Sequence, residues 1–385
     1  MHLTTIDLAY KKYKEHALFH RYITANHIAP LLEELSLKFE INEIGKSVNN
    51  LPIHSIQIGT GSKRILLWSQ MHGNESTTTK ALFDLINTFC NNDKKVYSIF
   101  SNCTLCIIPI LNPDGALAYT RLNANGIDLN RDAQDLTQPE SKLLREVFNT
   151  FKPNFCFNLH GQRTIFSAGD TNHSATVSFL APAQDKNCTL TNNRKVAMEV
   201  IGKMYTLLQN EIPDQVGVYD DAFNINCVGD TFQSMHVPTI LFEAGHFSDD
   251  YKREYTRELI YKSYMISLNY IAENDIDGSQ YKPYLTIPEN KKCFFDIIIR
   301  NALVSIDSKN IITDIGVMYI EKLIINTIEF IPKIEKISKL SKFFGHKEID
   351  ASGHKVLNVD FDDLKVGYEN DFVLINNVKY SLKIK

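Results

Sequence analysis

The most informative stretch of this sequence is Ile65-Leu66-Leu67-Trp68-Ser69-Gln70-Met71-His72-Gly73-Asn74-Glu75. Its first four residues form a short apolar run of the kind that makes a buried strand. Where that strand ends and a helix begins, a spacing of three residues lets the side chains of His72 and Glu75 face one point. Imidazole nitrogen and carboxylate oxygen are both good zinc ligands. The stretch therefore predicts a strand end that carries two ligands of a zinc site.

A catalytic zinc ion usually has three protein ligands and one open position, so a third ligand is expected elsewhere. The best candidate is His160, which also follows an apolar run, Phe155-Cys156-Phe157-Asn158-Leu159, and precedes a glycine. Open α/β sheets bind ligands at the carboxyl ends of their strands, where both clusters are expected to lie. A histidine and a glutamate at this spacing are more often a solvated surface pair, so the spacing alone is weak evidence. The expected position of both clusters at the carboxyl ends of strands is what favours a metal site.

Composition limits the class of protein. The 385 residues suffice for one large domain or two, and 44% hydrophobic residues are ordinary for a globular core. A net charge of −4 gives no reason to expect a nucleic-acid partner. The longest apolar runs are too short to span a membrane, so no membrane association is expected. Scattered cysteines and the lack of a signal-peptide pattern make us expect a cytoplasmic protein with reduced thiols.

Strand and helix patterns alternate between residues 50 and 275, which is typical of an α/β domain with a largely parallel or mixed sheet. Residues 1 to about 45 are expected to form a helical lead-in. Gly59-Thr60-Gly61-Ser62 predicts a hairpin loop, and Asn112-Pro113-Asp114-Gly115 predicts a turn. The expected strands are 53–58, 65–68, 105–110, 155–159, 177–180 and 239–242. The expected helices are 76–90, 139–151, 194–208 and 253–273.

The composition changes after a predicted linker at residues 274–279. Stretches rich in isoleucine, valine and tyrosine follow, and we expect strands at 294–299, 311–319, 323–330 and 372–384. Asn376-Asn377 predicts a hairpin turn. We therefore predict two domains, a main α/β domain over residues 1–275 and a small β-rich domain over residues 285–385. The smaller domain is expected to be structural or to restrict the substrate.

Three further charged residues stand out. Arg121 and Arg131 flank a segment rich in asparagine and glycine, and arginine is suited to two-pronged recognition of carboxylates. The alternative is a solvated loop. Glu243 ends the apolar run Thr239–Phe242, where partial desolvation would raise its pKa and suit it to proton transfer. The alternative is an acid paired with a nearby lysine.

Five motifs occur in chain order, and together they resemble the zinc metallocarboxypeptidase family, the carboxypeptidase A-like peptidases. They are His72-x-x-Glu75, Asn112-Pro113-Asp114-Gly115, Asp128-Leu129-Asn130-Arg131, Leu159-His160 and Thr239-Ile240-Leu241-Phe242-Glu243. The resemblance covers about half of the chain, and His-Gly-Asn-Glu is more similar to small bacterial intracellular members. It implies a three-layer α/β/α fold with a mixed, mostly eight-stranded sheet, followed here by a smaller C-terminal β-rich domain.

The resemblance also implies roles for the catalytic residues. His72, Glu75 and His160 would hold one zinc ion. Arg121 would polarise the scissile carbonyl and stabilise its oxyanion, and Glu243 would be the general base. The implied reaction is hydrolysis of a C-terminal peptide or amide bond by a metal-activated water.

The implied substrate-binding residues are Asn130 and Arg131, which would hold the terminal carboxylate, and Tyr219, the nearest candidate for the family's cleft tyrosine. An alternative is a zinc-dependent deacylase of N-acyl amino acids, similar to the aspartoacylase and succinylglutamate desuccinylase branch, which also carries a small C-terminal β domain. A third reading is a non-catalytic binding module on a peptidase fold. Such a module would usually have lost a ligand or the base.

Overall fold

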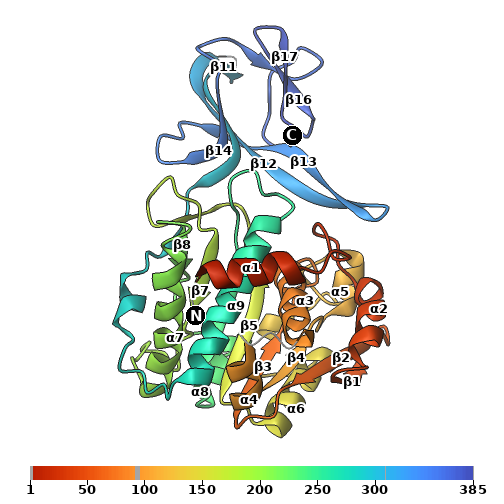
Figure 1. Cartoon of the computed structure of the whole chain (residues 1–385). Coiled ribbons are helices and arrows are strands. Elements are labelled where there is room, and N and C mark those ends of the chain that lie inside the picture. The colour runs from red at the N-terminus through yellow and green to blue at the C-terminus, as the bar shows by residue number, and fades with distance from the viewer. Residues whose placement is uncertain (1–2, 92–95, 308, 385) are drawn as a thin grey trace. The chain divides into compact units, whose positions relative to one another are not determined.

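The computed structural model describes residues 3–91, 96–307 and 309–384, and Figure 1 shows the course of the chain. The chain forms two compact units. The first unit comprises Met1–Gln162 and Ala175–Asn290, and the second unit comprises Arg163–Ser174 and Lys291–Lys385. None of the described helices combines the length and the apolar character that crossing a membrane requires.

The first unit contains an eight-stranded sheet in the order β1-β2-β4-β3-β5-β9-β7-β8. Strands β4, β3, β5 and β9 run parallel to one another. Antiparallel pairs join β1 to β2, β2 to β4 and β7 to β9, whereas β7 and the edge strand β8 are parallel. The predicted mixed α/β sheet is confirmed. The strands are β1 (Glu40–Lys46), β2 (Pro52–Ile58), β3 (Lys63–Trp68), β4 (Cys103–Ile108), β5 (Phe155–Gly161), β7 (Val177–Leu180), β8 (Val216–Val218) and β9 (Thr239–Ala244).

Helices cover both faces of this sheet (Figure 1). On β3, Ile65 and Leu67 join the core under α1, α3, α7 and α9, while Leu66 and Trp68 join the core under α6 and α8. A central strand with both faces buried explains the continuous apolar run in the sequence. The helices are α1 (Leu3–Tyr13), α2 (Ala25–Leu35), α3 (Thr77–Cys90), α4 (Tyr97–Asn102), α5 (Pro113–Ala118), α6 (Pro139–Phe151), α7 (Asn192–Leu208), α8 (Val228–Ser234) and α9 (Glu254–Glu273), with the 3₁₀ turns η2 (Leu129–Arg131) and η3 (Lys282–Thr286).

The predicted hairpin at residues 59–62 is wrong, because β4 lies between β2 and β3 in the sheet. The backbone N–H of Gly61 donates to the carbonyl of Cys103 at 3.1 Å. A Cβ atom on Gly61 would lie 1.9 Å from the carbonyl carbon of Asn102. The two glycines of this loop therefore let it pass over the start of β4 instead of closing a hairpin.

Two other local predictions need correction. The helical lead-in is shorter than 45 residues, since Glu40–Lys46 forms the edge strand β1, antiparallel to β2. The turn at residues 112–115 is the first turn of the short helix α5. Asn112 caps it by accepting a hydrogen bond from the backbone N–H of Gly115, and Pro113 occupies the first helical position, where its missing N–H costs nothing.

The second unit is built from strands, as predicted for the C-terminal region. A four-stranded sheet has the order β13-β12-β11-β14, and a three-stranded sheet has the order β15-β16-β17. Asn376 and Asn377 have φ of 50° and 62° and join β16 to β17, which confirms the predicted hairpin turn. The strands are β11 (Phe294–Ile306), β12 (Lys309–Ile324), β13 (Thr327–Ser338), β14 (Phe344–Asp350), β15 (Val356–Leu357), β16 (Phe372–Ile375) and β17 (Val378–Ser381).

The expected single strand at residues 323–330 is wrong, because the chain turns between β12 and β13 at Ile325, which has φ of 58°. The second unit also includes a segment taken from the middle of the chain. There β6 (Phe166–Ala168) pairs with β10 (Asn290–Lys292). The N–H of Phe294 donates to the carbonyl of Ile165 at 3.1 Å.

A buried ion pair ties two helices of the first unit together. Arg257 of α9 donates to both carboxylate oxygens of Asp84 on α3, each at 2.6 Å, and both side chains are fully buried. Arg257 also donates to the carbonyls of Glu15 and Leu18 in the segment that follows α1. One guanidinium group therefore joins α3, α9 and the N-terminal segment.

We expect Arg257→Ala to lower the free energy of unfolding by about 3–5 kcal/mol, because the buried carboxyl group of Asp84 would lose its cationic partner and keep only the N–H of Glu15. Urea unfolding followed by circular dichroism measures the change. Lys46→Ala is the matched control, since Lys46 forms an exposed pair with Glu43 at 3.8 Å, and exposed pairs contribute about 0–1 kcal/mol. Equal unfolding midpoints for the two variants would contradict this account of the buried pair.

Candidate active site

The loop between β3 and α3 is held in a tight conformation. Gln70 adopts φ of 44°, and its buried amide donates to the carbonyls of Ile23 and Gly73 at 3.0 and 2.8 Å. A Cβ atom on Gly73 would lie 1.9 Å from the carbonyl carbon of Gly115 in α5. Only glycine permits this approach. The loop therefore leaves β3 along one narrow path, which fixes where His72 lies.

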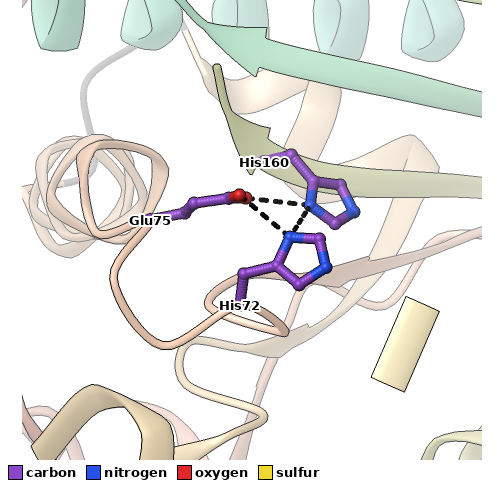
Figure 2. A group of neighbouring side chains, drawn as sticks. All are labelled: His72, Glu75 and His160. Atoms are coloured by element: carbon purple, nitrogen blue, oxygen red, sulfur yellow. Dashed lines mark hydrogen bonds and ion pairs between the residues drawn. The ribbon is translucent and has the colours of Figure 1, made fainter. Parts of the chain in front are cut away.

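His72, Glu75 and His160 converge on one point (Figure 2). Nδ1 of His72 lies 2.9 Å from Oε1 of Glu75, and Nδ1 of His160 lies 3.0 Å from Oε2 of the same carboxylate. The two Nδ1 atoms are 3.0 Å apart. His72 and Glu75 come from the loop before α3, and His160 comes from the end of β5. The structure thus brings together the three residues that the sequence singled out.

The donor set of this cluster fits a divalent cation such as zinc. Nε2 of His72 lies 3.0 Å from Oδ1 of Asp128, so a neutral His72 carries its proton on Nε2 and aims the lone pair of Nδ1 at Glu75. Two imidazole lone pairs and a carboxylate that face one another at 3 Å repel unless a proton or a cation lies among them. A carboxylate behind a ligating histidine is also the usual support of a metal site.

The pKa values of the three residues follow from this geometry. Burial alone would raise the pKa of Glu75, but His72 and His160 beside it hold that pKa below its ordinary value. Burial would lower the pKa of His72, yet Glu75 and Asp128 raise it overall. Burial lowers the pKa of His160, which favours the neutral form that a metal needs.

Asp128 belongs to the motif Asp128-Leu129-Asn130-Arg131, and its carboxylate lies between Arg121 and His72. Its Oδ2 accepts from Nε and Nη2 of Arg121 at 3.1 and 3.0 Å, while its Oδ1 faces His72. Nη1 of Arg121 reaches Oε1 of Glu75 at 3.3 Å. Burial would raise the pKa of Asp128, but His72 and Arg121 hold it low. Nothing in the sequence distinguishes this aspartate from an ordinary turn residue.

Glu243 lies beside His160 because β5 and β9 are parallel and the two residues are register partners. Its Oε2 atom is buried and has no hydrogen-bond partner in the described part of the chain. Burial, and then the negative charge of Glu75, raise the pKa of Glu243 well above its ordinary value. A carboxylate in this position is suited to accept and release a proton.

Asn130 and Arg131 lie in the turn η2, which the buried side chain of Leu129 anchors in the core. Asp128 caps this turn by accepting from the N–H of Asn130 at 2.9 Å. Oδ1 of Asn130 accepts from the N–H of Val228 at 3.0 Å, which orients the side chain. The guanidinium of Arg131 is exposed and donates to the carbonyl of Asn130. The turn therefore presents one oriented amide and one exposed cation.

Tyr219 follows β8, and its N–H donates to the carbonyl of Phe179 at 3.1 Å. Burial raises the pKa of the Tyr219 phenol, and the negative charges of Glu243 and Glu75 raise it further. The phenol is therefore within electrostatic reach of both carboxylates. All the candidate residues named from the sequence belong to the first unit.

Two of the solved structures that resemble this chain are carboxypeptidases. The carboxypeptidase A of Helicoverpa armigera matches with a TM-score of 0.53 and 15% identity, over 70% of this chain and 80% of that chain. A metallo-carboxypeptidase from Burkholderia cenocepacia matches with a TM-score of 0.52 and 15% identity, over 65% of this chain and 69% of that chain. At these identities the likeness establishes the fold, and the predicted three-layer architecture is confirmed.

Sequence comparison gives a more specific relation. Carboxypeptidase SOL1 of Arabidopsis thaliana is 35% identical over 137 residues, which are 31% of this chain and 28% of that protein. The chain thus spans less than a third of the length of this curated relative. A sequence model of the zinc carboxypeptidase family (Peptidase_M14) matches residues 27–221, just over half of the 385 residues. By this match, the chain belongs to the zinc carboxypeptidase family, whose members use a catalytic zinc ion.

Proposed function

We propose that this protein is a zinc-dependent carboxypeptidase, which hydrolyses the C-terminal bond of a peptide with a free carboxylate. The observation that carries the proposal is the convergence of His72, Glu75 and His160 within hydrogen-bond distance, next to the register partner Glu243. The family match supports the same reading, although it ends at residue 221. The role of Glu243 therefore rests on geometry.

His72, Glu75 and His160 would hold the zinc ion through Nδ1, the carboxylate and Nδ1. Zinc bound there supplies Lewis-acid chemistry, because it lowers the pKa of water and polarises a carbonyl oxygen. Glu243 accepts the proton of the attacking water at Oε2, which has no hydrogen-bond partner among the described residues. It then delivers the proton to the leaving amine. Its buried position and the nearby charge of Glu75 favour the protonated form that the second step needs.

Two arginine side chains, Arg121 and Arg131, would bind the negatively charged oxygens of the substrate. The guanidinium of Arg121 lies 3.3 Å from Oε1 of Glu75, and it is 45% exposed, so it can donate to a substrate carbonyl. Negative charge that develops on that oxygen is stabilised by fixed donors. The exposed guanidinium of Arg131 and the amide of Asn130 bind the terminal carboxylate. Tyr219 is assigned to the substrate cleft, because the charge of Glu243 acts on the pKa of its phenol.

The zinc-loaded protein should release single C-terminal residues from short peptides. A mixed panel of peptides and N-acyl amino acids, with product masses measured by mass spectrometry, tests this. Peptides that are amidated at the C-terminus should be poor substrates, because they lack the carboxylate. Release of acetate or succinate alone would instead support the deacylase reading, and no turnover of any substrate would favour a binding module.

Glu243→Gln should lower kcat by about 10²–10⁴-fold, because the amide cannot accept a proton from water. Zinc content, measured by atomic absorption, should stay at the wild-type level, whereas His160→Ala should lose the metal. Glu34→Gln is the control, since Glu34 is exposed and belongs to no candidate site. Substantial turnover in Glu243→Gln would remove this residue from the base role.

Arg131→Ala should raise KM about 10- to 100-fold for peptides with a free carboxylate, the loss expected for a hydrogen bond to a charged group. The value of kcat should change little, because the contact forms in both the ground state and the transition state. Steady-state kinetics on matched free and amidated peptides measures the effect. An equal loss on both substrates would contradict the assignment of Arg131 to the carboxylate.

A further inference from the structure

One residue of the loop before η2 differs from its neighbours. Residues 120–127 are exposed, except for Asn123, which is 4% exposed. An exposed loop usually keeps its asparagines in water. The buried side-chain amide of Asn123 is therefore expected to hold the loop in one conformation.

Asn123 organises the loop from within. Its Oδ1 accepts from the N–H groups of Asn125 and Ile127 at 3.1 and 3.0 Å. Its own N–H donates to the carbonyl of Ile127, and its carbonyl accepts from Gly126. Gly126 has φ of 73°, a conformation that glycine adopts without strain. The loop is thus closed around one side chain.

The other end of the same side chain anchors the loop to the N-terminus of α6. Nδ2 of Asn123 donates to Oε1 of Gln138 at 2.9 Å and to Oε2 of Glu140 at 3.2 Å. Glu140 is fully buried, and its Oε1 accepts from the N–H of Val48 at 3.2 Å. Both carboxylate oxygens of Glu140 therefore face N–H donors, one from the loop and one from the turn between β1 and β2.

The two ends of this loop carry two charged residues of the candidate active site. Arg121 lies two residues before Asn123 and Asp128 lies five residues after it. Arg121 and Asp128 bind each other, and they contact Glu75 and His72 respectively. A shift of Asn123 would therefore move a guanidinium and a carboxylate that touch two candidate zinc ligands.

We propose that Asn123, anchored by Glu140, is a positioning residue that fixes Arg121 and Asp128 against the metal-binding side chains. The inference rests on the proposed function for its kinetic effect and on geometry alone for its effect on metal affinity. Asn123 touches none of the reacting groups and acts through the two ends of its loop. A displacement of about 1 Å at a reacting group can cost about 10²-fold in rate.

Asn123→Asp tests the anchor while it keeps an oxygen for the hydrogen bonds inside the loop. The substitution removes both donors and places a second carboxylate against the buried Glu140. We expect kcat to fall about 10- to 100-fold, with a smaller change in KM. Zinc affinity, measured by competition with a chromophoric chelator, should weaken about 10-fold, because Asp128 supports His72. Asn125→Ala is the matched control, since Asn125 is exposed and also donates to Gln138.

A second substitution, at Glu140, distinguishes loss of the hydrogen bond between Asn123 and Glu140 from a general folding defect. When Glu140→Gln is added to Asn123→Asp, a donor and an acceptor again face each other, and an oxygen remains for the N–H of Val48. This double variant should recover most of the lost kcat and zinc affinity. In an Arg121→Ala background, Asn123→Asp should cost little additional kcat, because the two residues act as a unit.

Two results would overturn the proposal. One is wild-type kcat and zinc affinity per folded molecule in Asn123→Asp, even with a lower melting temperature, which would make Asn123 a structural residue only. The other is a double variant that regains stability but neither kcat nor zinc affinity. If the wild-type protein turns over no substrate, the proposed function fails, and the zinc affinities alone still decide whether Asn123 positions the site.

Discussion

The parallel register of β3, β5 and β9 is the constraint on which the rest of the molecule depends. Trp68 is the partner of Asn158, and His160 is the partner of Glu243, so the three strands end at the same edge of the sheet. A slip of one residue between β5 and β9 would turn Glu243 to the opposite face from His160. Burial of both faces of these strands makes such a slip costly, since it would expose apolar side chains and bury polar ones.

Glu75 connects the ends of the parallel strands to the residues of the candidate active site. It accepts a hydrogen bond from the N–H of Gly161 at the end of β5 and contacts both histidines, and its charge raises the pKa of Glu243. The same carboxylate also receives Arg121. One side chain thus contacts the end of β5, both candidate metal-binding histidines and the loop that carries Arg121, and its charge acts on the candidate base. Glu75 can keep its buried charge because His72, His160 and Arg121 all contact its carboxylate.

The sequence was sufficient to predict those strands and site residues where a polar, reactive side chain directly follows an apolar run. Apolar runs that end in a polar residue located β3, β5 and β9, and the histidines and acids at their ends are the residues that meet in the structure. The sequence was insufficient to predict features that depend on pairing between residues far apart in the chain. Nothing near Gly59 shows that β4 enters between β2 and β3, and nothing near Asp128 shows that His72 lies opposite. The anchor between Asn123 and Glu140 spans 17 residues and two elements, so local periodicity could not reveal it.

The chain passes from the first unit into the second and back before it enters the second unit again, so the two units cannot be separated by a single cut. Residues 163–174 lie in sequence between β5 and β7 of the first unit, yet they belong to the second unit, where β6 pairs with β10. No single cleavage yields two complete units, because the C-terminal fragment would lack the strand that remains within the N-terminal one. Truncation near residue 290 would also leave β6 unpaired just beyond His160. The C-terminal region is therefore not a separable module that can be deleted or exchanged without affecting the segment that follows His160 in the sequence.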